Sequence, residues 1–437
     1  MKKESGKTAP ESKPFWFSLD NAAKIFPAVI TREVTSVFRL SVVLKQPVRM
    51  ELLQKAVLQA EDRFPYYLVQ LKEGFFWYYL EHLSRHIPII ADERPTICRR
   101  FRKGELLLRI LVRKNRISLE GSHILTDGAG AFIFFRTILL LYFEASGISF
   151  PEGGLPHAAP EVVSAEEYED AYKRYFKDDI PPMVKRSKAF HLPFTLNSRP
   201  RFRQTTATLS MLQMKQAAKE KGVSITVYLV AVYLHTLQEI HNNLGRLNRQ
   251  RKCKRLRVQV PVNLRKIFPS KTMRNFSLFV MPEIDLRLGQ YSFDEIIKTV
   301  YHQMQLESDE KLINKNIARN VGGEKKRVVR GIPLFLKSFI LRMKYYSLGT
   351  GQYSGVITNL GKVDLPEETR ELIDHLIIIP PPPNKMLKLN CGVIGFGDKL
   401  VLSFGNITRS NEFEERFLHF LTTHHISVET ETKTDQP

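Results

Sequence analysis

The sequence predicts a mixed α/β fold, with mixed α+β sheets, built as two related halves. Three observations indicate this. Strand-like and helix-like apolar patterns are interspersed along the chain, some strands are joined as antiparallel hairpins, and the series of elements repeats loosely from about residue 205. The 437 residues are also enough for two or three domains, since one domain takes roughly 100–200 residues.

The first half is expected to cover residues 14–185. Its strands follow from runs of β-branched and aromatic residues, and its helices from apolar residues at helical spacing. The expected elements, in order, are a strand at 34–44, a helix at 50–64, an aromatic strand at 74–80, a hairpin of strands 106–112 and 116–124, and an apolar helix at 129–142.

A polar, proline-flanked crossover at residues 186–204 is expected to lead into the second half, at residues 205–427. There, Gly397-Asp398 is a strong short hairpin signal between two strands. The expected elements are strands at 205–209, 256–262, 276–284, 353–360, 386–396 and 400–404, and helices at 211–221, 226–240 and 412–423.

The composition is that of a folded protein with a large positive charge. Hydrophobic residues make up 43% of the chain, which excludes wholesale disorder. The net charge of +21 predicts an anionic partner, such as a phosphorylated cosubstrate, nucleic acid or an anionic membrane.

Cysteine usage and the terminal segments predict a cytoplasmic protein. Cys98, Cys253 and Cys391 are too far apart for a metal knuckle or a redox pair, and a disulfide framework is excluded. The N-terminus has charge without the apolar segment of a secretory signal, and no run of 18 uninterrupted apolar residues occurs. Residues 1–13 and 428–437 are polar and are expected to be flexible tails.

The strand at 116–124 carries the feature that points to chemistry. Ile117, Leu119 and His123 share one face of this strand, and His123 lies at its end, just before a glycine-rich turn. An imidazole, with an unperturbed pKa of about 6.5, is suited to act as a general base there. The structural alternative is a core histidine followed by Asp127 as a helix N-cap.

The segment Ser122-His123-Ile124-Leu125-Thr126-Asp127-Gly128 resembles the HxxxDG signature of the CoA-dependent acyltransferase superfamily. This superfamily includes chloramphenicol acetyltransferases, plant acyltransferases, condensation domains of nonribosomal peptide synthetases and wax ester synthases. The resemblance spans about residues 15–425 and is closest to bacterial alcohol-acetyltransferase-like proteins. The other stretches that carry it are 258–265 with Arg274-Asn275-Phe276, Ile357-Thr358-Asn359-Leu360-Gly361, and Leu19–Pro27 with Arg63-Phe64-Pro65.

The sequence departs from two branches of this superfamily. Condensation domains usually carry a second histidine at the position of Ser122. Plant members have a DFGWG loop where this chain has Ser403-Phe404-Gly405-Asn406, so plant-type contacts with CoA are not transferred and the CoA-binding residues stay unassigned.

The resemblance implies two chloramphenicol-acetyltransferase-like subdomains in a V-shaped pseudo-dimer, with His123 in a central tunnel. His123 would take a proton from the acceptor as it attacks an acyl-CoA thioester, with no metal, no bound cofactor and no covalent acyl-enzyme. Gly128 would leave room beside His123, or serve simply as a turn glycine. Asp127 is implied to be architectural and to pair with Arg265, with Arg39 as the second candidate.

Three polar residues are candidates to stabilise the oxyanion or bind substrate. Thr358 and Asn359 would face the tunnel in such a fold, and Asn275 precedes a second-half strand. The alternative for the pair at 358–359 is that it stabilises the turn at Leu360-Gly361.

Three further segments allow structural or functional interpretations. The stretch 246–257 holds seven cations, which either bind CoA phosphates or a carrier protein or form a solvated loop; it lacks the interleaved aromatics that nucleic-acid binding favours. The apolar stretch 331–348 is interpreted as a buried helix lining the acyl tunnel, with a helix lying on a membrane as the alternative. Residues 379–383 (IPPPP) are expected to be a rigid extended connection.

The leading functional hypothesis is a monomeric, CoA-dependent alcohol O-acyltransferase. A second hypothesis is a condensation-type enzyme that takes acyl groups from a carrier protein and passes them to an amine or alcohol. A third, from another class, is a catalytically inactive binding or membrane-associated module. The sequence leaves the acyl-chain length and the acceptor open.

Overall fold

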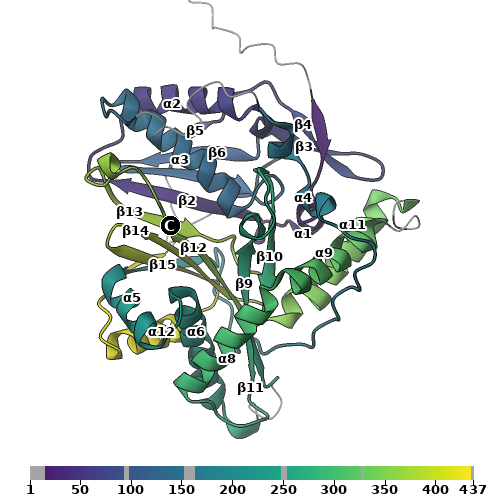
Figure 1. Cartoon of the computed structure of the whole chain (residues 1–437), viewed down its shortest axis with the longest axis vertical. Helices are drawn as coiled ribbons and strands as arrows, with labels where there is room; N and C mark the ends of the chain where they lie inside the picture. Colours follow the sequence, from purple (N-terminus) through teal and green to yellow (C-terminus); the bar gives the residue numbers. More distant parts are fainter. Residues whose placement is uncertain are drawn as a thin grey trace, which may run out of the picture.

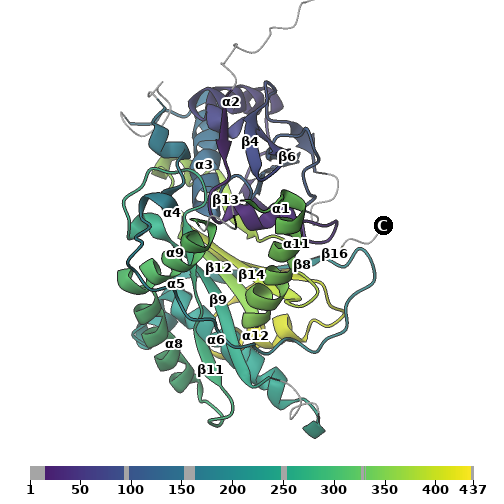
Figure 2. The same ribbon diagram turned by 90° about the vertical axis from the view of Figure 1, so that its right-hand side faces the viewer.

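In a computed structural model, the chain forms two lobes, each built on a mixed β-sheet covered by helices (Figure 1). The structure describes residues 15–92, 98–151, 163–247, 253–325, 329 and 331–434. This arrangement confirms the predicted mixed α/β class and its two halves, and Figure 2 shows the lobes stacked along the long axis of the molecule.

The first lobe is built on a five-stranded sheet of order β13-β2-β7-β6-β5. Its pairs are antiparallel except for the parallel pair β5–β6. Helices α2 and α3 pack against each other beside this sheet. The elements drawn from the first half are β2 (Val37–Leu44), α2 (Met50–Arg63), β5 (Ile89–Ala91), β6 (Leu108–Arg113), β7 (Arg116–Ser122) and α3 (Gly128–Ala145).

A small sheet and several short helices complete this lobe. The sheet has the order β1-β4-β3 and includes the predicted aromatic strand, displaced toward residue 82. The elements are β1 (Trp16–Ser18), η1 (Ala23–Ile25), α1 (Phe26–Val29), η2 (Pro65–Tyr67), β3 (Val69–Glu73), β4 (Tyr78–His82), η3 (Ala165–Tyr168) and α4 (Ala171–Arg174).

The second lobe is built on a sheet with strand order β10-β9-β12-β14-β15-β8-β16, to which β11 adds by pairing with β9. Helices α6, α8 and α12 cover it (Figure 1). Its strands are β8 (Arg203–Ser210), β9 (Arg255–Asn263), β10 (Ser277–Val280), β11 (Glu283–Asp285), β12 (Gly355–Lys362), β14 (Leu389–Phe396), β15 (Lys399–Asn406) and β16 (Val428–Thr434). Its helices are α5 (Met211–Glu220), α6 (Ile225–Asn242), η4 (Leu264–Lys266), α8 (Phe293–Glu307), α9 (Glu310–Lys325), α11 (Leu334–Lys344), the π-helical turn η5 (Tyr345–Gly349), η6 (Thr350–Gln352), η7 (Glu367–Thr369) and α12 (Glu412–Thr423).

One strand of the second half crosses into the first lobe. β13 (Ile373–Ile379) pairs antiparallel with β2, with Leu376 opposite Val42. Its Leu-Ile-Ile-Ile run is buried, so this pairing adds apolar area to the core of the first lobe. The lobes are therefore not separated cleanly at residue 205.

Three sequence expectations need correction. Residues 428–434 are not a flexible tail but strand β16, which completes the edge of β8, with Val428 opposite Leu209. The single strand expected at 276–284 is divided into β10 and β11 around Pro282, which has no N–H to donate to the ladder. Helices α8 and α9 were not predicted, although Ser292 and Glu295 form a capping box at the start of α8.

The helix at 331–348 also differs from its prediction. α11 leaves a row of large apolar side chains exposed, so it does not line an interior tunnel as a buried helix. By contrast, α3 is long and apolar enough to span a membrane by composition but is mostly buried in the core; the bent pair α5–α6 passes the same length-and-composition test.

Candidate active site

His123 directly follows β7, at the edge of the sheet that faces the second lobe. Its backbone N–H donates to Ser36 O at 3.0 Å, just before β2 begins. Its carbonyl accepts from Asn275 Nδ2 at 3.0 Å, from the second half of the chain. The alternation predicted for β7 is confirmed, because Ile117 and Leu119 lie in the core while Glu120 contacts Arg39 on the other face.

The imidazole of His123 lies between two aromatic rings. The ring of Phe26 stacks on it with centroids 5.5 Å apart, and that of Phe38 is tilted at 4.7 Å. Burial lowers the pKa of His123 below its usual value, opposed by the charge of Asp127 and by hydrogen bonding with Asn275 and the backbone of Thr126. The residue as a whole is partly exposed, and its lowered pKa favours the neutral imidazole at pH 7.

Asp127 caps helix α3 and binds the second half of the chain. Its Oδ1 accepts from Gly130 N at 2.9 Å, which is the predicted N-cap interaction. Its Oδ2 accepts from Arg265 Nη1 at 2.9 Å and from Phe276 N at 2.8 Å. The ion pair implied by the resemblance is therefore present, whereas Arg39 binds Glu120 instead.

Arg265 is itself held in place on several sides. Its guanidinium donates to the carbonyls of Thr272 and Arg274 and to Asn263 Oδ1. The nearby carbonyl of Met273 accepts from Thr126 Oγ1 at 2.6 Å and from the Tyr67 hydroxyl at 2.8 Å. These contacts fix the motif loop against residues 263–274 of the other half.

Two glycines allow this close approach. A Cβ on Gly130 would lie 2.3 Å from the Met273 carbonyl oxygen, so only glycine fits there. Gly128 is the first residue of α3 and not a turn residue, and its Cβ would lie 3.2 Å from Leu360 Cδ2 in β12. The structure thus places β12 beside the start of α3.

The three candidate oxyanion donors have different surroundings. Asn275 directs its amide nitrogen to His123 O and to Asp20 Oδ2, so its two N–H groups are already used and it positions the His123 backbone. Asn359 bonds Thr226 Oγ1 and Gly361 N, which is the turn-stabilising alternative, with Gly361 at a φ of +80°.

Thr358 is the candidate that this geometry leaves available. It shares a face of β12 with Leu360, the residue next to Gly128, while Ile357 points into the core of the second lobe. Its side chain is partly exposed, and no hydrogen bond of its hydroxyl is found among the described residues. Thr358 therefore stays the candidate donor, since its hydroxyl is not committed to a described partner.

The basic stretch at 246–257 is only partly an open surface. Residues 248–252 lie outside the described residues. Arg257, in β9, is buried and donates to Glu283 and to the carbonyls of Ser187 and Gln352. Within the described ranges, no group of three or more His, Cys, Asp or Glu side chains is arranged to hold a metal ion.

Solved structures with the same arrangement exist at low sequence identity. Polyketide synthase associated protein 5 from Mycobacterium tuberculosis matches 93% of this chain and 97% of its own, with a TM-score of 0.58 and 12% identity. TRI101 from Fusarium sporotrichioides, complexed with coenzyme A and T-2, gives 0.58 and 11%, covering 96% and 99%. The epimerization domain of tyrocidine synthetase B gives 0.59 and 10%, covering 96% and 97%. The chain therefore shares the fold of these three proteins. No protein-family model matches the sequence, and the comparison with curated proteins found no match.

This fold includes a buried acid, Asp20, that the sequence did not mark as a site residue. Asp20 Oδ1 accepts from Ala23 N at 2.8 Å, and its Oδ2 accepts from Asn275 Nδ2 at 3.0 Å. Asp20 thus positions the side-chain amide of Asn275, which in turn donates to the carbonyl of His123. Burial raises the pKa of Asp20 to about 6, opposed mainly by the charge of Arg274.

This raised pKa predicts a pH-dependent loss of stability. The folded-state pKa of Asp20 lies above its unfolded value, so the folded state favours the protonated carboxyl. The contribution of Asp20 to the free energy of unfolding is therefore greatest below about pH 4 and is lost as pH rises through 6. The free energy of unfolding of the wild type, relative to Asp20→Asn, should fall by about 2–3 kcal/mol between pH 4 and pH 7. Urea titrations at both pH values measure this difference. The exposed control Glu368→Gln should show no such trend, and equal pH dependence in wild type and Asp20→Asn would refute the prediction.

Proposed function

We propose that this protein is an acyltransferase that moves an acyl group from a CoA thioester to an alcohol, with His123 as general base. The observation that carries the proposal is the His123 imidazole itself. Its lowered pKa favours the uncharged form at neutral pH, and its residue is held between the lobes because its backbone N–H donates to Ser36 O and its carbonyl accepts from the Asn275 side chain. The fold that this chain shares with TRI3 trichothecene 15-O-acetyltransferase supports the proposal further.

The reaction needs a base and a donor for the oxyanion. The imidazole takes the hydroxyl proton of the acceptor as its oxygen attacks the thioester carbonyl, and a C–O bond forms. The tetrahedral intermediate carries a negative charge, for which the Thr358 hydroxyl is the proposed donor. When the C–S bond breaks, the leaving thiolate takes the proton back from the imidazolium. No acyl-enzyme forms in this sequence of steps.

The proposal is tested by following free thiol while the protein is incubated with a panel of acyl-CoAs. Each donor is supplied alone, with alcohols and with amines. Thiol release that depends on an alcohol supports O-acylation. Thiol release that depends on an amine would show that the nucleophile is nitrogen and not oxygen. Release only from a carrier-protein thioester would favour the condensation-type alternative.

The lowered pKa of His123 predicts the pH profile of the reaction. Because the neutral imidazole is the base and burial favours that form, kcat/KM should hold constant on lowering pH and fall only below pH 6.5. The measurement is kcat/KM for acyl-CoA from pH 5 to pH 9 at saturating alcohol. A decrease in kcat/KM that already begins at or above pH 6.5 on lowering the pH would show that another group titrates.

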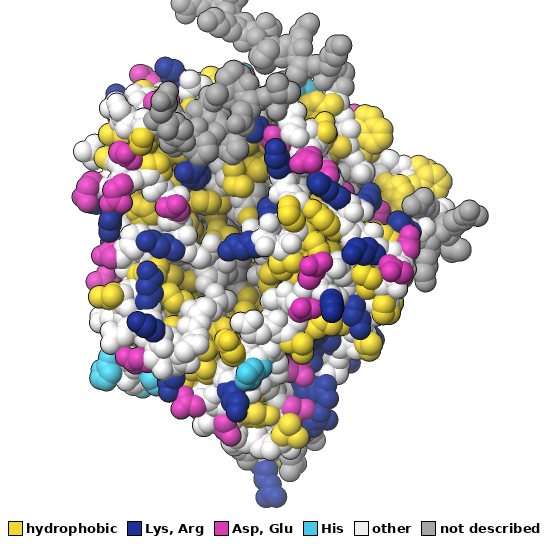
Figure 3. All heavy atoms as spheres, in the orientation of Figure 1, with side chains coloured by type: hydrophobic (Ala, Val, Ile, Leu, Met, Phe, Trp, Pro, Cys, Tyr) yellow, Lys and Arg dark blue, Asp and Glu magenta, His cyan; other side chains and the backbone are white. Residues whose placement is uncertain are grey.

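We also propose that this protein binds an anionic membrane. This second proposal rests on an exposed apolar surface. α11 presents Phe335 and Phe339, which are 71% and 63% exposed, one turn apart on one face. The aromatic turn before β4 adds Phe75, 72% exposed, and is joined to α11 by a hydrogen bond from Leu334 N to Phe75 O. We call α11 and residues 75–76 the apolar patch; Figure 3 shows hydrophobic side chains gathered at that edge of the molecule.

The charges around the apolar patch suit anionic lipid. Arg342 and Lys344 are exposed at the end of α11, and the whole chain carries +21. Arg342 also donates to the carbonyl of Ala28, so α11 lies on α1, whose Phe26 stacks on His123 (Figure 2). A membrane-bound acceptor would therefore reach the protein close to the proposed base.

Sedimentation with vesicles measures this contact. The wild type should co-sediment with phosphatidylcholine vesicles that contain phosphatidylglycerol, and Phe335→Ser/Phe339→Ser should lower the bound fraction several-fold. The matched control Leu212→Ser/Leu288→Ser removes two equally exposed side chains elsewhere and should bind as the wild type does. Binding that is equal in both variants, or a concentration-dependent dimer abolished only by the first, would refute membrane docking.

A further inference from the structure

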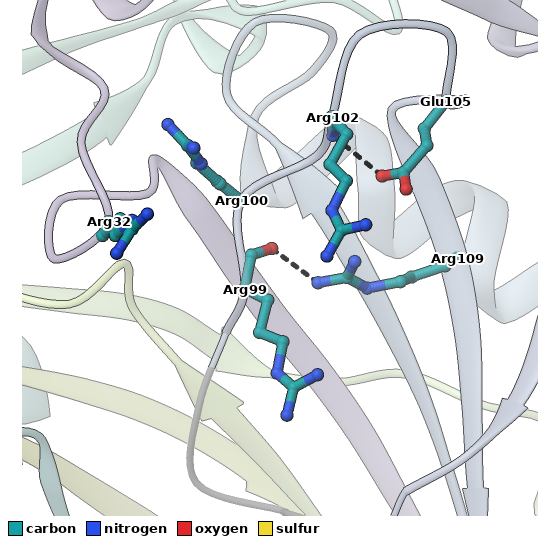
Figure 4. A pocket seen from close by; sticks show the side chains of 6 residues that line it. All are labelled: Arg32, Arg99, Arg100, Arg102, Glu105 and Arg109. Atoms are coloured by element: carbon teal, nitrogen blue, oxygen red, sulfur yellow. Dashed lines mark hydrogen bonds between the residues drawn. The ribbon is translucent and has the colours of Figure 1, made fainter. Parts of the chain in front are cut away.

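A cavity of about 600 Å³ in the first lobe is lined almost entirely by arginines (Figure 4). Five guanidinium groups and one carboxylate surround it. They come from the segment before β2, from residues 99–105 and from β6. The lining residues are Arg32, Arg99, Arg100, Arg102, Glu105 and Arg109.

The positive charge of this arginine cavity is largely uncompensated. Glu105 accepts from the backbone N–H of Arg102 at 2.8 Å, and Arg109 is paired with Glu120. Within the part of the chain that the structure describes, no hydrogen bond or ion pair holds the guanidiniums of the other four arginines. Like charges that converge on a concave site repel one another, and a compact polyanion relieves that repulsion.

A second cavity of about 280 Å³ adjoins the first and shares Glu105 and Arg109 with it. Its lining includes Ile90, Phe101 and Leu106, so it offers an apolar place beside the cations. Arg109 also stacks over Phe101, 4.6 Å from the ring centre. A flat heterocycle next to several phosphates fits this pair of cavities better than inorganic phosphate alone does.

The arginine cavity lies near the same ends of the strands as His123. β2 and β6 flank β7 on either side, with Val37 opposite Ser122 and Leu108 opposite Gly121. Arg32 and Arg102 precede these two strands by a few residues, so both lie at the end of the sheet where β7 reaches His123. Arg109 pairs with Glu120 on the face of the sheet opposite to Ile117 and Leu119, so a ligand anchored there would have to pass around the end of β7 to bring a flexible arm to the imidazole.

We infer that the arginine cavity and its neighbour bind the 3′-phosphoadenosine diphosphate end of coenzyme A. The inference rests on the proposed function and assigns the donor-binding residues that the sequence left open. Guanidinium groups bind the 3′-phosphate and the diphosphate through charge-assisted hydrogen bonds, and the second cavity takes the adenine. A concave site lined by a few arginines suits this compact anion better than it suits the broad acidic face of a carrier protein.

Binding measurements test this inference without requiring turnover. Calorimetric titration with CoA, dephospho-CoA and adenosine 3′,5′-bisphosphate compares the wild type with Arg99→Ala/Arg102→Ala. The variant should bind CoA and the bisphosphate at least about tenfold more weakly. The preference of the wild type for CoA over dephospho-CoA should disappear in the variant. The control Lys103→Ala/Arg113→Ala removes the same charge from exposed positions outside the cavity and should bind like the wild type.

The outcomes separate this inference from the proposed function. Unchanged CoA affinity in Arg99→Ala/Arg102→Ala, or an equal loss in the control, would overturn the nucleotide site even if acyl transfer is observed. Weakened binding only in the cavity variant supports the site even if no acyl transfer is found. If Arg99→Ala/Arg102→Ala binds CoA like the wild type but no longer transfers acyl groups from a carrier-protein thioester, the arginine cavity binds a carrier protein and not CoA.

Discussion

Replacing His123 with alanine is expected to reduce kcat/KM for acyl transfer by a factor of about 10²–10⁴, the usual contribution of a positioned general base. No other histidine occupies the place between Phe26 and Phe38 in the described residues, so no neighbouring side chain can take over the proton. The fold should survive, because the backbone N–H and C=O of residue 123 keep their hydrogen bonds to Ser36 and Asn275.

Thiol release, thermal melting and CoA affinity should be measured on the same preparation of His123→Ala. The control His419→Ala removes an exposed imidazole from α12 and should leave all three values unchanged. Activity of His123→Ala within tenfold of the wild type would contradict the role as base. A collapsed melting temperature would show instead that His123 is a core histidine.

The second large effect is expected from the ion pair between Asp127 and Arg265. Both side chains are largely buried, with exposed fractions of 6% and 11%. Removing one partner leaves a buried charge without its counter-charge, which costs roughly 3–5 kcal/mol. Asp127→Asn and Arg265→Ala should therefore each lower the free energy of unfolding, and activity should fall with it because the loop that carries His123 loses its attachment.

A double-mutant cycle on urea unfolding measures the coupling between these two positions. Strong coupling is expected, and Arg265→Lys should rescue poorly because an ammonium lacks the fork that reaches Asp127, Asn263 and Thr272 together. The exposed pair Lys221 and Asp294 provides a matched cycle, for which coupling of at most about 1 kcal/mol is expected. Additive effects at 127 and 265 would show that they do not stabilise each other.

Local patterns were sufficient to predict much of this fold. The period-two alternation of 116–124 correctly separated Ile117 and Leu119 from Glu120, although β7 ends at Ser122, one residue before His123. The 3.6-residue periodicity of 412–423 matched α12. β13 could not be assigned this way, because its partner β2 lies more than 300 residues earlier in the chain. The strand at 276–284 was predicted as one element because its apolar pattern outweighed the break at Pro282.

The candidate site was predictable where a motif fixes both residue and role, and not where the partner comes from elsewhere in the chain. Asn275 was a reasonable oxyanion candidate by residue type, but Asp20, 255 residues away, accepts a hydrogen bond from its amide N–H. α11 was expected to be buried because its composition is apolar. Composition alone does not distinguish a helix covered by a protein core from one covered by a membrane. The arginine cavity joins Arg32 to Arg99–Arg109, a proximity that exists only in the folded chain.

Mass spectrometry that quantifies the acylated acceptor and the free CoA released in the same reaction tests direct acyl transfer by this protein. Direct transfer predicts one acylated alcohol for each thiol and no mass increase on the intact protein at any time. Thiol release without acylated acceptor, or an acyl group carried on the protein itself, would contradict the proposed reaction.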